Sequence, residues 1–227
     1  MCFNERTSWL TLLVGSAVNA YVLSRLGPSS PEATLVLLWW FGLLMQVPEA
    51  LEWRAVREGR AEGKGNARLA LVLNLLQPVV AAGGLLLLGE RLGGDAPASA
   101  WALPAALLFA YCLRVAVHWP EMWADARIRP GPAPSRDGEA ACDHMQLRWW
   151  RGRRVLLGLY IATFLASFAG ALPSRWAVAM GGYFVGTLLL SRGLYPCSTG
   201  SMWCWLVASS GLVIGATQAI AGPIRSA

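Results

Sequence analysis

An amide, a proline and two carboxylates stand at the end of a long apolar stretch, in the segment LLMQVPEALEW at residues 43–53. Gln46, Glu49 and Trp53 are three and four residues apart, so a helix places them on one face. An ionisable group within hydrocarbon is costly and marks a candidate for solute binding or charge relay. Pro48 donates no backbone hydrogen bond, which leaves the carbonyl of Leu44 open to another partner. The segment therefore predicts a polar site within an apolar helix.

Two further apolar stretches carry polar side chains at helical spacing. Asn74 and Gln77 are three residues apart in one stretch, and Arg114 and His118 are four apart in the other. Glu49 and Arg114 each lie about four residues, or roughly 6 Å, from the same end of their stretches, so we expect them to pair in one layer. The alternative is that both side chains extend to the membrane surface and form no site. The predicted ligand-binding set is Gln46, Glu49, Trp53, Asn74, Gln77, Arg114 and His118.

The composition predicts a protein of the bilayer that holds these groups between helices. Hydrophobic residues make up 56% of the chain and charged residues 14%, against about a quarter charged in a soluble domain. Runs long enough, or nearly so, to cross about 30 Å of hydrocarbon lie at about 8–26, 33–53, 68–89, 97–118, 155–172, 174–191 and 203–222. We expect an all-α, multi-pass membrane bundle of about seven transmembrane helices in a single domain, residues 1–227. These spans argue against a soluble nucleic-acid binder despite the net charge of +6.

The distribution of positive charge predicts the orientation. Of the 19 Lys and Arg residues, 14 fall on the side of the N-terminus and 4 on the opposite side. The positive-inside rule then places the N-terminus in the cytosol and the C-terminus on the other side, in a membrane that the sequence leaves open. The first run also has features of a cleavable signal, but its apolarity continues to Leu26, which favours a retained helix.

The longest connection, residues 119–154, is predicted to be a flexible cytosolic loop. It contains RPGPAPSRDGEA at 129–140, which is rich in proline, glycine and charge. It ends with LRWWRGRR at 147–154, where basic and aromatic residues alternate. This alternation suits anionic lipid headgroups, but a helix-entry anchor that fixes the topology without lipid specificity explains it more simply.

Two glycine pairs predict close helix contacts. Gly182 and Gly186 are four residues apart in the sixth run, and Gly211 and Gly215 are four apart in the seventh. Small residues at this spacing let helix backbones approach one another.

Cysteine and histidine residues raise the possibility of a thiol or metal site. Thiolate and imidazole suit zinc or copper, but no tight C-x-x-C or H-x-x-x-H spacing is present. Free thiols, or palmitoylation of one of them, are the alternative, and the cofactor is left open. The candidate thiol and metal residues are Cys2, His144, Cys197 and Cys204, with His118 nearby in the topology.

Four stretches resemble a family of uncharacterised multi-pass membrane proteins of large DNA viruses, algae and bacteria. They are MCFN at 1–4, MQVPEALEW at 45–53, CDHMQLRWW at 142–150 and GSMWCW at 200–205. The chain departs from the family pattern at the proline of QVPE. The resemblance implies a polytopic membrane protein and no assigned activity. The residues that carry it are Cys2, Gln46, Glu49, Trp53, His144, Trp203, Cys204 and Trp205.

Three functions remain open at this stage. A transporter or channel-like protein would use Glu49 to bind or relay charge, while Gln46 and Asn74 hydrogen-bond a small polar or cationic solute. A protein that organises the membrane without turnover would use the polar layer only for packing. A membrane-embedded thiol or metal redox protein would use Cys2 and Cys204. We rank them in this order.

Overall fold

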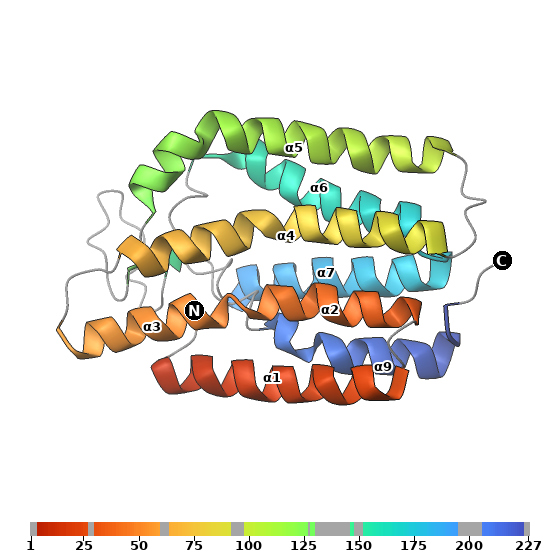
Figure 1. The fold of residues 1–227 in the computed structure, drawn as a ribbon, viewed down its shortest axis with the longest axis horizontal. Coiled ribbons are helices and arrows are strands. Elements are labelled where there is room, and N and C mark those ends of the chain that lie inside the picture. The colour runs from red at the N-terminus through yellow and green to blue at the C-terminus, as the bar shows by residue number, and fades with distance from the viewer. Residues whose placement is uncertain are drawn as a thin grey trace.

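The computed structural model describes residues 4–26, 30–59, 64–91, 98–126, 128–129, 146–147, 152–194 and 206–224. These residues form an all-α bundle, as predicted, whose helices run side by side along one axis (Figure 1). A two-residue antiparallel pairing of β1 (Ile128–Arg129) with β2 (Gln146–Leu147) is the β structure among them. The helices are α1 (Glu5–Leu26), α2 (Pro31–Leu43), α3 (Gln46–Arg57), α4 (Lys64–Arg91), α5 (Ala98–Asp125), α6 (Arg154–Ala171), α7 (Ser174–Leu194) and α9 (Ser210–Ala221), the last preceded by a 3-10 turn η2 (Val207–Ser209).

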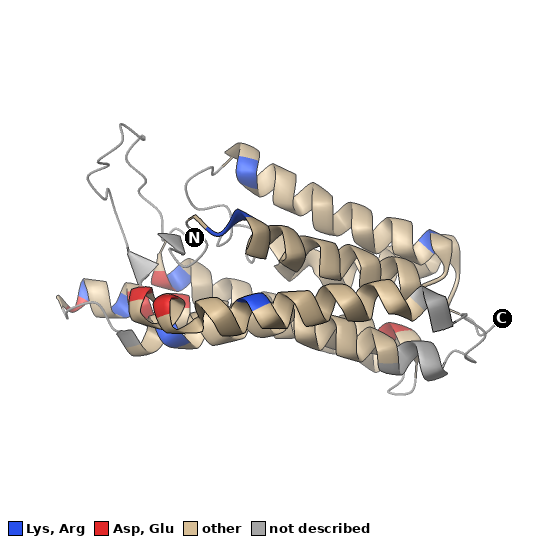
Figure 2. Ribbon diagram, turned by 90° about the horizontal axis from the view of Figure 1, so that it is seen from above, with Lys and Arg blue, Asp and Glu red and all other residues tan. Residues whose placement is uncertain are grey.

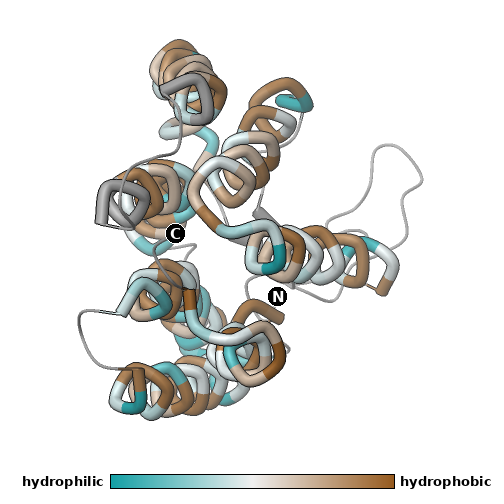
Figure 3. Tube along the Cα trace, turned by 90° about the vertical axis from the view of Figure 1, so that its right-hand side faces the viewer, coloured by the Kyte–Doolittle hydropathy of each residue, from teal (hydrophilic) through white to brown (hydrophobic). Residues whose placement is uncertain are grey.

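Six helical segments of the described chain are long and apolar enough to cross a membrane, with α2 and α3 together forming one of them. A shorter apolar helix, Val207–Ala221, follows. Large apolar side chains also cover the outside: Phe109 is 72% exposed, Val178 74% and Ile220 87%. Hydrophobic residues recur on the outer faces of the helices (Figure 3). The chain is therefore a multi-pass membrane protein, because such a surface is stable against lipid rather than water.

The two ends of the described chain lie at opposite ends of the bundle. Glu5 at the start of α1 makes ion pairs of 2.9 Å with Arg54 and with Arg57 at the end of α3. The backbone N–H of Ile224 donates to the carboxylate of Glu32 in the first turn of α2. Figure 2 shows charged residues gathered mostly towards one end of the bundle. This arrangement fits the odd number of crossings and the charge asymmetry predicted from the sequence.

The predicted second span is two helices with a turn at Leu44 and Met45. Pro48 lies four residues after Leu44 and has no N–H to donate to it. The expected open carbonyl is not found, because the N–H of Val47 donates to Leu44 at 3.0 Å. The backbone forms one tighter turn here, so the carbonyl of Leu44 keeps a hydrogen-bond partner.

Pro78 leaves α4 uninterrupted, unlike the break near Pro48. The helix continues from Lys64 to Arg91 with this proline inside it. In the turn before the proline, the hydroxyl of Tyr111 on α5 donates to the carbonyl of Leu75 at 2.9 Å. Side chains of neighbouring helices commonly bond backbone groups near a transmembrane proline in this way.

One predicted boundary requires correction. The fourth span continues to Asp125 rather than stopping at residue 118, so the first part of the predicted loop 119–154 is helical. Trp123, expected in that loop, lies in α5 and stacks on Trp119 with ring centroids 5.1 Å apart. A short turn at Leu172 and Pro173 separates α6 from α7, in agreement with the predicted bounds of the fifth and sixth spans.

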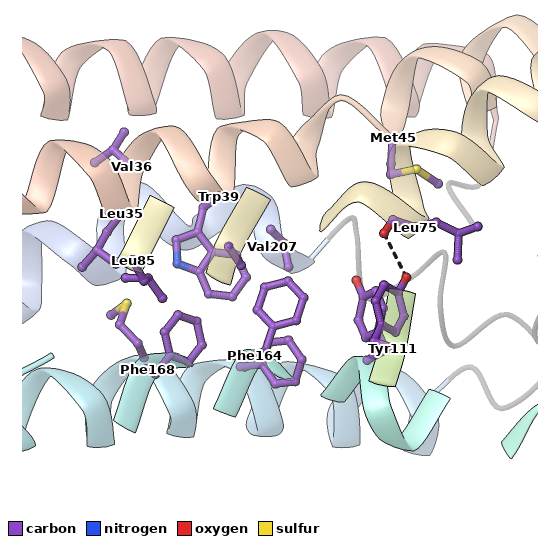
Figure 4. Packing of buried hydrophobic residues seen from close by; sticks show 14 of the residues in the cluster. Leu35, Val36, Trp39, Met45, Leu75, Leu85, Tyr111, Phe164, Phe168 and Val207 are labelled. Carbon is purple, nitrogen blue, oxygen red and sulfur yellow. Dashed lines mark hydrogen bonds between the residues drawn. The ribbon is translucent and has the colours of Figure 1, made fainter. Parts of the chain in front are cut away.

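Aromatic side chains fill the centre of the bundle (Figure 4). Trp39 of α2 stacks on Phe168 of α6 at 6.1 Å between centroids. Phe164 of α6 stacks on Phe184 of α7 at 4.8 Å. Trp39 also meets Tyr183 edge-on at 5.4 Å. Such pairs add to the stabilisation from packing, and they connect α2, α6 and α7 across the core.

Three of the four glycines in the predicted pairs make no close contact with another helix. A Cβ atom on Gly182, Gly186 or Gly215 would meet no neighbour within 4 Å. A Cβ on Gly211 would lie 2.5 Å from Oδ1 of Asn19 and 3.1 Å from Cγ1 of Val18. The close approach is therefore confined to Gly211, where α9 packs on α1.

We expect Gly211→Ala to destabilise the protein by about 1–3 kcal/mol, because the added methyl group overlaps the buried side chain of Asn19. Gly215→Ala, one turn along the same helix, should leave stability unchanged or slightly raise it. Thermal unfolding of the purified protein in one detergent compares the two variants. Equal melting temperatures for both would show that α1 and α9 do not approach as described.

Candidate functional site

Five polar side chains on α3 and α4 are withdrawn from the surface. Each is exposed by 4% or less. Helices α3 and α4 pack on one another, and α3 also packs on α1. The five are Gln46, Glu49, Glu52, Asn74 and Gln77. With the half-buried Asn66 of α4 they form what we call the polar ladder.

Two contacts show how the segment 42–52 is aligned with the segment 66–77 of α4. Nδ2 of Asn66 donates to Oε2 of Glu52 at 3.1 Å, near the charged end of the bundle. Further in, a Cβ on Gly42 would lie 4.0 Å from Nε2 of Gln77. The segment 42–52 therefore runs antiparallel to the segment 66–77. Gln46 and Glu49 fall between these two contacts.

The local structure of α3 explains why carboxylates occur at these positions. Glu49 lies in the first turn of α3, directly after the turn at Leu44 and Met45. The N-terminus of a helix carries partial positive charge, which favours a carboxylate there. Gln46, Glu49 and Glu52 are each three residues apart and share the face of α3 that is buried. The helix break thus sets both the depth and the electrostatic surroundings of Glu49.

The structure brings together four of the seven predicted ligand-binding residues. Gln46, Glu49, Asn74 and Gln77 all belong to the polar ladder. Trp53 is half-buried and packs against the apolar core. The position next to it, Glu52, has the buried side chain instead. Glu52 and Trp53 lie three and four residues after Glu49, and both spacings place a residue on the same side of a helix. The spacing alone therefore did not show which of the two side chains is buried.

Arg114 and His118 lie apart from the ladder. Arg114 is exposed on α5, and the described residues show no ion pair between it and Glu49. It follows Leu113, which is 55% exposed, so this side of α5 faces outward. The predicted Glu49–Arg114 pair is therefore wrong. Equal depth in the membrane did not put the two side chains on facing sides of their helices.

His118 belongs to an ion cluster at the end of α5. Its Nδ1 lies 3.6 Å from Oε2 of Glu121, and Nη2 of Arg153 lies 3.2 Å from the same oxygen. Arg153 also approaches Oδ2 of Asp125 at 3.8 Å. The side chain of Arg153, which belongs to the segment 147–154, is 12% exposed and connects α5 to the start of α6.

Sequence reasoning missed the partner that orients Gln77. The hydroxyl of Tyr160 on α6 donates to Oε1 of Gln77 in a short hydrogen bond. The ring of Tyr160 also meets Tyr111 edge-on at 6.2 Å. Nε2 of Gln77 has no hydrogen-bond partner among the described residues. A tyrosine in an apolar run was the available signal, but its partner lies 83 residues away in the chain.

Asn19 of α1 is a second buried amide that the sequence did not single out. It is fully buried, and neither its Nδ2 nor its Oδ1 has a hydrogen-bond partner in the described part of the chain. It lies against Gly211 of α9, outside the polar ladder.

The predicted thiol and metal residues lie outside the part of the chain that the structure describes. Within the described ranges, no group of three or more His, Cys, Asp or Glu side chains is arranged to hold a metal ion. Cys112 is a free, exposed cysteine on α5. The four candidates lie outside the described residues, as do two family-motif tryptophans: Cys2, His144, Cys197, Cys204, Trp203 and Trp205.

Comparison with protein-family models, with curated proteins and with solved structures gave no match for this chain. The resemblance to the viral, algal and bacterial membrane family stays a prediction.

Tyr111→Phe should lower stability by about 0.5–1.5 kcal/mol, since it removes the hydroxyl that bonds the Leu75 carbonyl near Pro78. Tyr21→Phe is the control, because Tyr21 is 61% exposed and its hydroxyl has no comparable partner among the described residues. Thermal unfolding in detergent measures both. Equal melting temperatures for the two variants would show that the hydrogen bond of Tyr111 does not stabilise the protein.

Proposed function

We propose that this membrane protein transports or conducts a small polar or cationic solute, which binds at the polar ladder. The observation that supports the proposal is Glu49, a fully buried carboxylate one turn after a helix break. Discontinuous helices that present polar groups inside a bundle are a recurring basis of solute and ion sites in transporters.

The chemistry of the ladder favours a cation over an anion. Glu49 and Glu52 provide two carboxylates on one helix face, and both are at most 1% exposed. A carboxylate in hydrocarbon is costly, and a bound cation or proton reduces that cost. The amide groups of Gln46 and Asn74 in the ladder are suited to hydrogen-bond the solute. In this scheme Glu49 carries the charge-binding role.

The position of the ladder favours entry from the cytosolic side. Glu52 and Asn66 lie towards the end of α3 where Arg54 and Arg57 pair with Glu5. By the positive-inside rule this end faces the cytosol. The aromatic core around Trp39 and Phe164 lies further along the bundle (Figure 4). A solute that leaves on the opposite side therefore requires this core to rearrange.

Reconstituted liposomes test the proposal. Vesicles loaded with a pH-sensitive dye report proton-coupled movement when Na⁺, K⁺ or methylammonium is added outside, and a membrane-potential dye reports uncoupled cation flux. We expect flux of at least one cation in the wild type. Glu49→Gln should reduce it by about tenfold or more, the effect of losing one charged contact.

Glu58→Gln provides the matched control, because Glu58 is an exposed carboxylate at the end of the same helix. It should leave flux unchanged. Equal flux for the wild type and Glu49→Gln would exclude a role for this carboxylate. A correctly folded protein with no flux of any tested cation would favour the role in organising the membrane.

A further inference from the structure

An arginine without a partner among the described residues lies on the outer face of α5. Figure 1 shows α5 along the edge of the bundle, and it is the least buried of the six candidate spans. Arg114 is exposed on this helix and makes no ion pair within the described ranges. Leu113 and Val117 beside it are also exposed, so lipid chains cover this face. A guanidinium in hydrocarbon is costly, and Arg114 therefore requires a counter-ion from outside the bundle.

The headgroup level of the membrane is within reach of Arg114. Trp119 and Trp123 stack on one another further along α5, and tryptophans near the end of a span mark that level. Arg114 precedes Trp119 by five residues, which is roughly 8 Å at 1.5 Å per residue. An arginine at this depth keeps its aliphatic stem in hydrocarbon and extends its guanidinium towards the membrane surface. The phosphate of a lipid is the counter-ion available there.

The side of α5 that carries Arg114 ends in two exposed carboxylates. Arg114, His118, Glu121 and Asp125 are four, three and four residues apart, which places them on one side of the helix. The side chains of Glu121 and Asp125 are 65% and 67% exposed. We call these four residues the α5 stripe. It has a cation at its deeper end and carboxylates at its outer end.

The two carboxylates share one arginine of the bundle. Nη2 of Arg153 lies 3.2 Å from Oε2 of Glu121 and 3.8 Å from Oδ2 of Asp125. Nδ1 of His118 lies 3.6 Å from Glu121 and adds positive charge only when the ring is protonated. Arg154, exposed at the start of α6, makes no ion pair with either carboxylate. The outer end of the stripe is therefore suited to accept a further ammonium group.

We propose that the α5 stripe binds phosphatidylethanolamine, a lipid whose headgroup carries a phosphate and a primary ammonium. The phosphate accepts hydrogen bonds from the guanidinium of Arg114. The ammonium, which is attached on the water side of the phosphate, donates to Glu121 and Asp125. The acyl chains lie against Leu113 and Val117. The order of charges from hydrocarbon to water is thus complementary in lipid and stripe, and the site goes beyond the proposed transport function.

Other occupants fit the α5 stripe less well. An anionic lipid places only negative charge beside Glu121 and Asp125, which repel it. The quaternary ammonium of phosphatidylcholine has no N–H to donate to a carboxylate. A second copy of the chain, related by a two-fold axis along the membrane normal, would bring each charge of the stripe opposite its own kind.

Three lipids with identical acyl chains test the headgroup: phosphatidylethanolamine, phosphatidylcholine and phosphatidylglycerol. Native mass spectrometry of the purified protein, released from detergent with each lipid in turn, gives the three dissociation constants. We expect phosphatidylethanolamine to bind most tightly and the other two to bind about tenfold more weakly, the effect of one charge-assisted contact. Equal affinity for phosphatidylethanolamine and phosphatidylcholine would overturn the proposal, and so would tighter binding of phosphatidylglycerol.

Variants then locate the site. Arg114→Gln should fold normally, because the side chain is exposed, and should weaken phosphatidylethanolamine binding by about tenfold. Arg192→Gln is the matched control, since it removes the same charge from an exposed position in the last turn of α7, and it should bind as the wild type does. Glu121→Gln should abolish the preference for phosphatidylethanolamine over phosphatidylcholine. Equal affinities of Arg114→Gln and Arg192→Gln would contradict the proposal, as would a wild-type dimer that Arg114→Gln dissociates.

Discussion

Hydrocarbon offers no hydrogen bonds, and this constraint explains most of the structure. Each polar group within a span has to find a partner inside the bundle or lie near its end. Hydroxyl groups do so locally: Thr163 donates to the carbonyl of Leu159 and Ser167 to that of Thr163, both at 2.7 Å. Larger polar groups need another helix, as Tyr111 and Tyr160 do with α4. The polar ladder is the place where such groups accumulate.

The two ends of the bundle are stabilised by different means. At the charged end, Glu5 pairs with Arg54 and Arg57, which connects α1 to α3. At the other end, the segment after α9 is held by Glu32, which accepts the N–H of Ile224, and by Trp176, whose indole N–H donates to the carbonyl of Gly222 at 3.2 Å. Exposed ion pairs contribute little individually. Arg54 and Arg57 are 43% and 67% exposed, whereas Glu32 and Trp176 are buried.

The two prolines next to polar residues have opposite consequences, and both serve the polar ladder. Near Pro48 the helix breaks, so α3 begins afresh with Gln46 and Glu49 in its first turn. Around Pro78 the helix persists, so Asn74 and Gln77 stay on one continuous face of α4. One helix is interrupted and the other continues, and the ladder forms where they pack together.

The sequence alone determined the membrane class, the all-α architecture, and the clustering of polar residues in the second and third spans. Composition and run length suffice for this, because any chain with these apolar runs must bury backbone hydrogen bonds in helices. Tertiary structure decided which polar residues meet. Helical spacing allowed both Glu52 and Trp53 beside Glu49, and equal depth allowed Arg114. The rotation of each helix about its own axis, which depends on packing against distant segments, buried Glu52 and turned Arg114 outward.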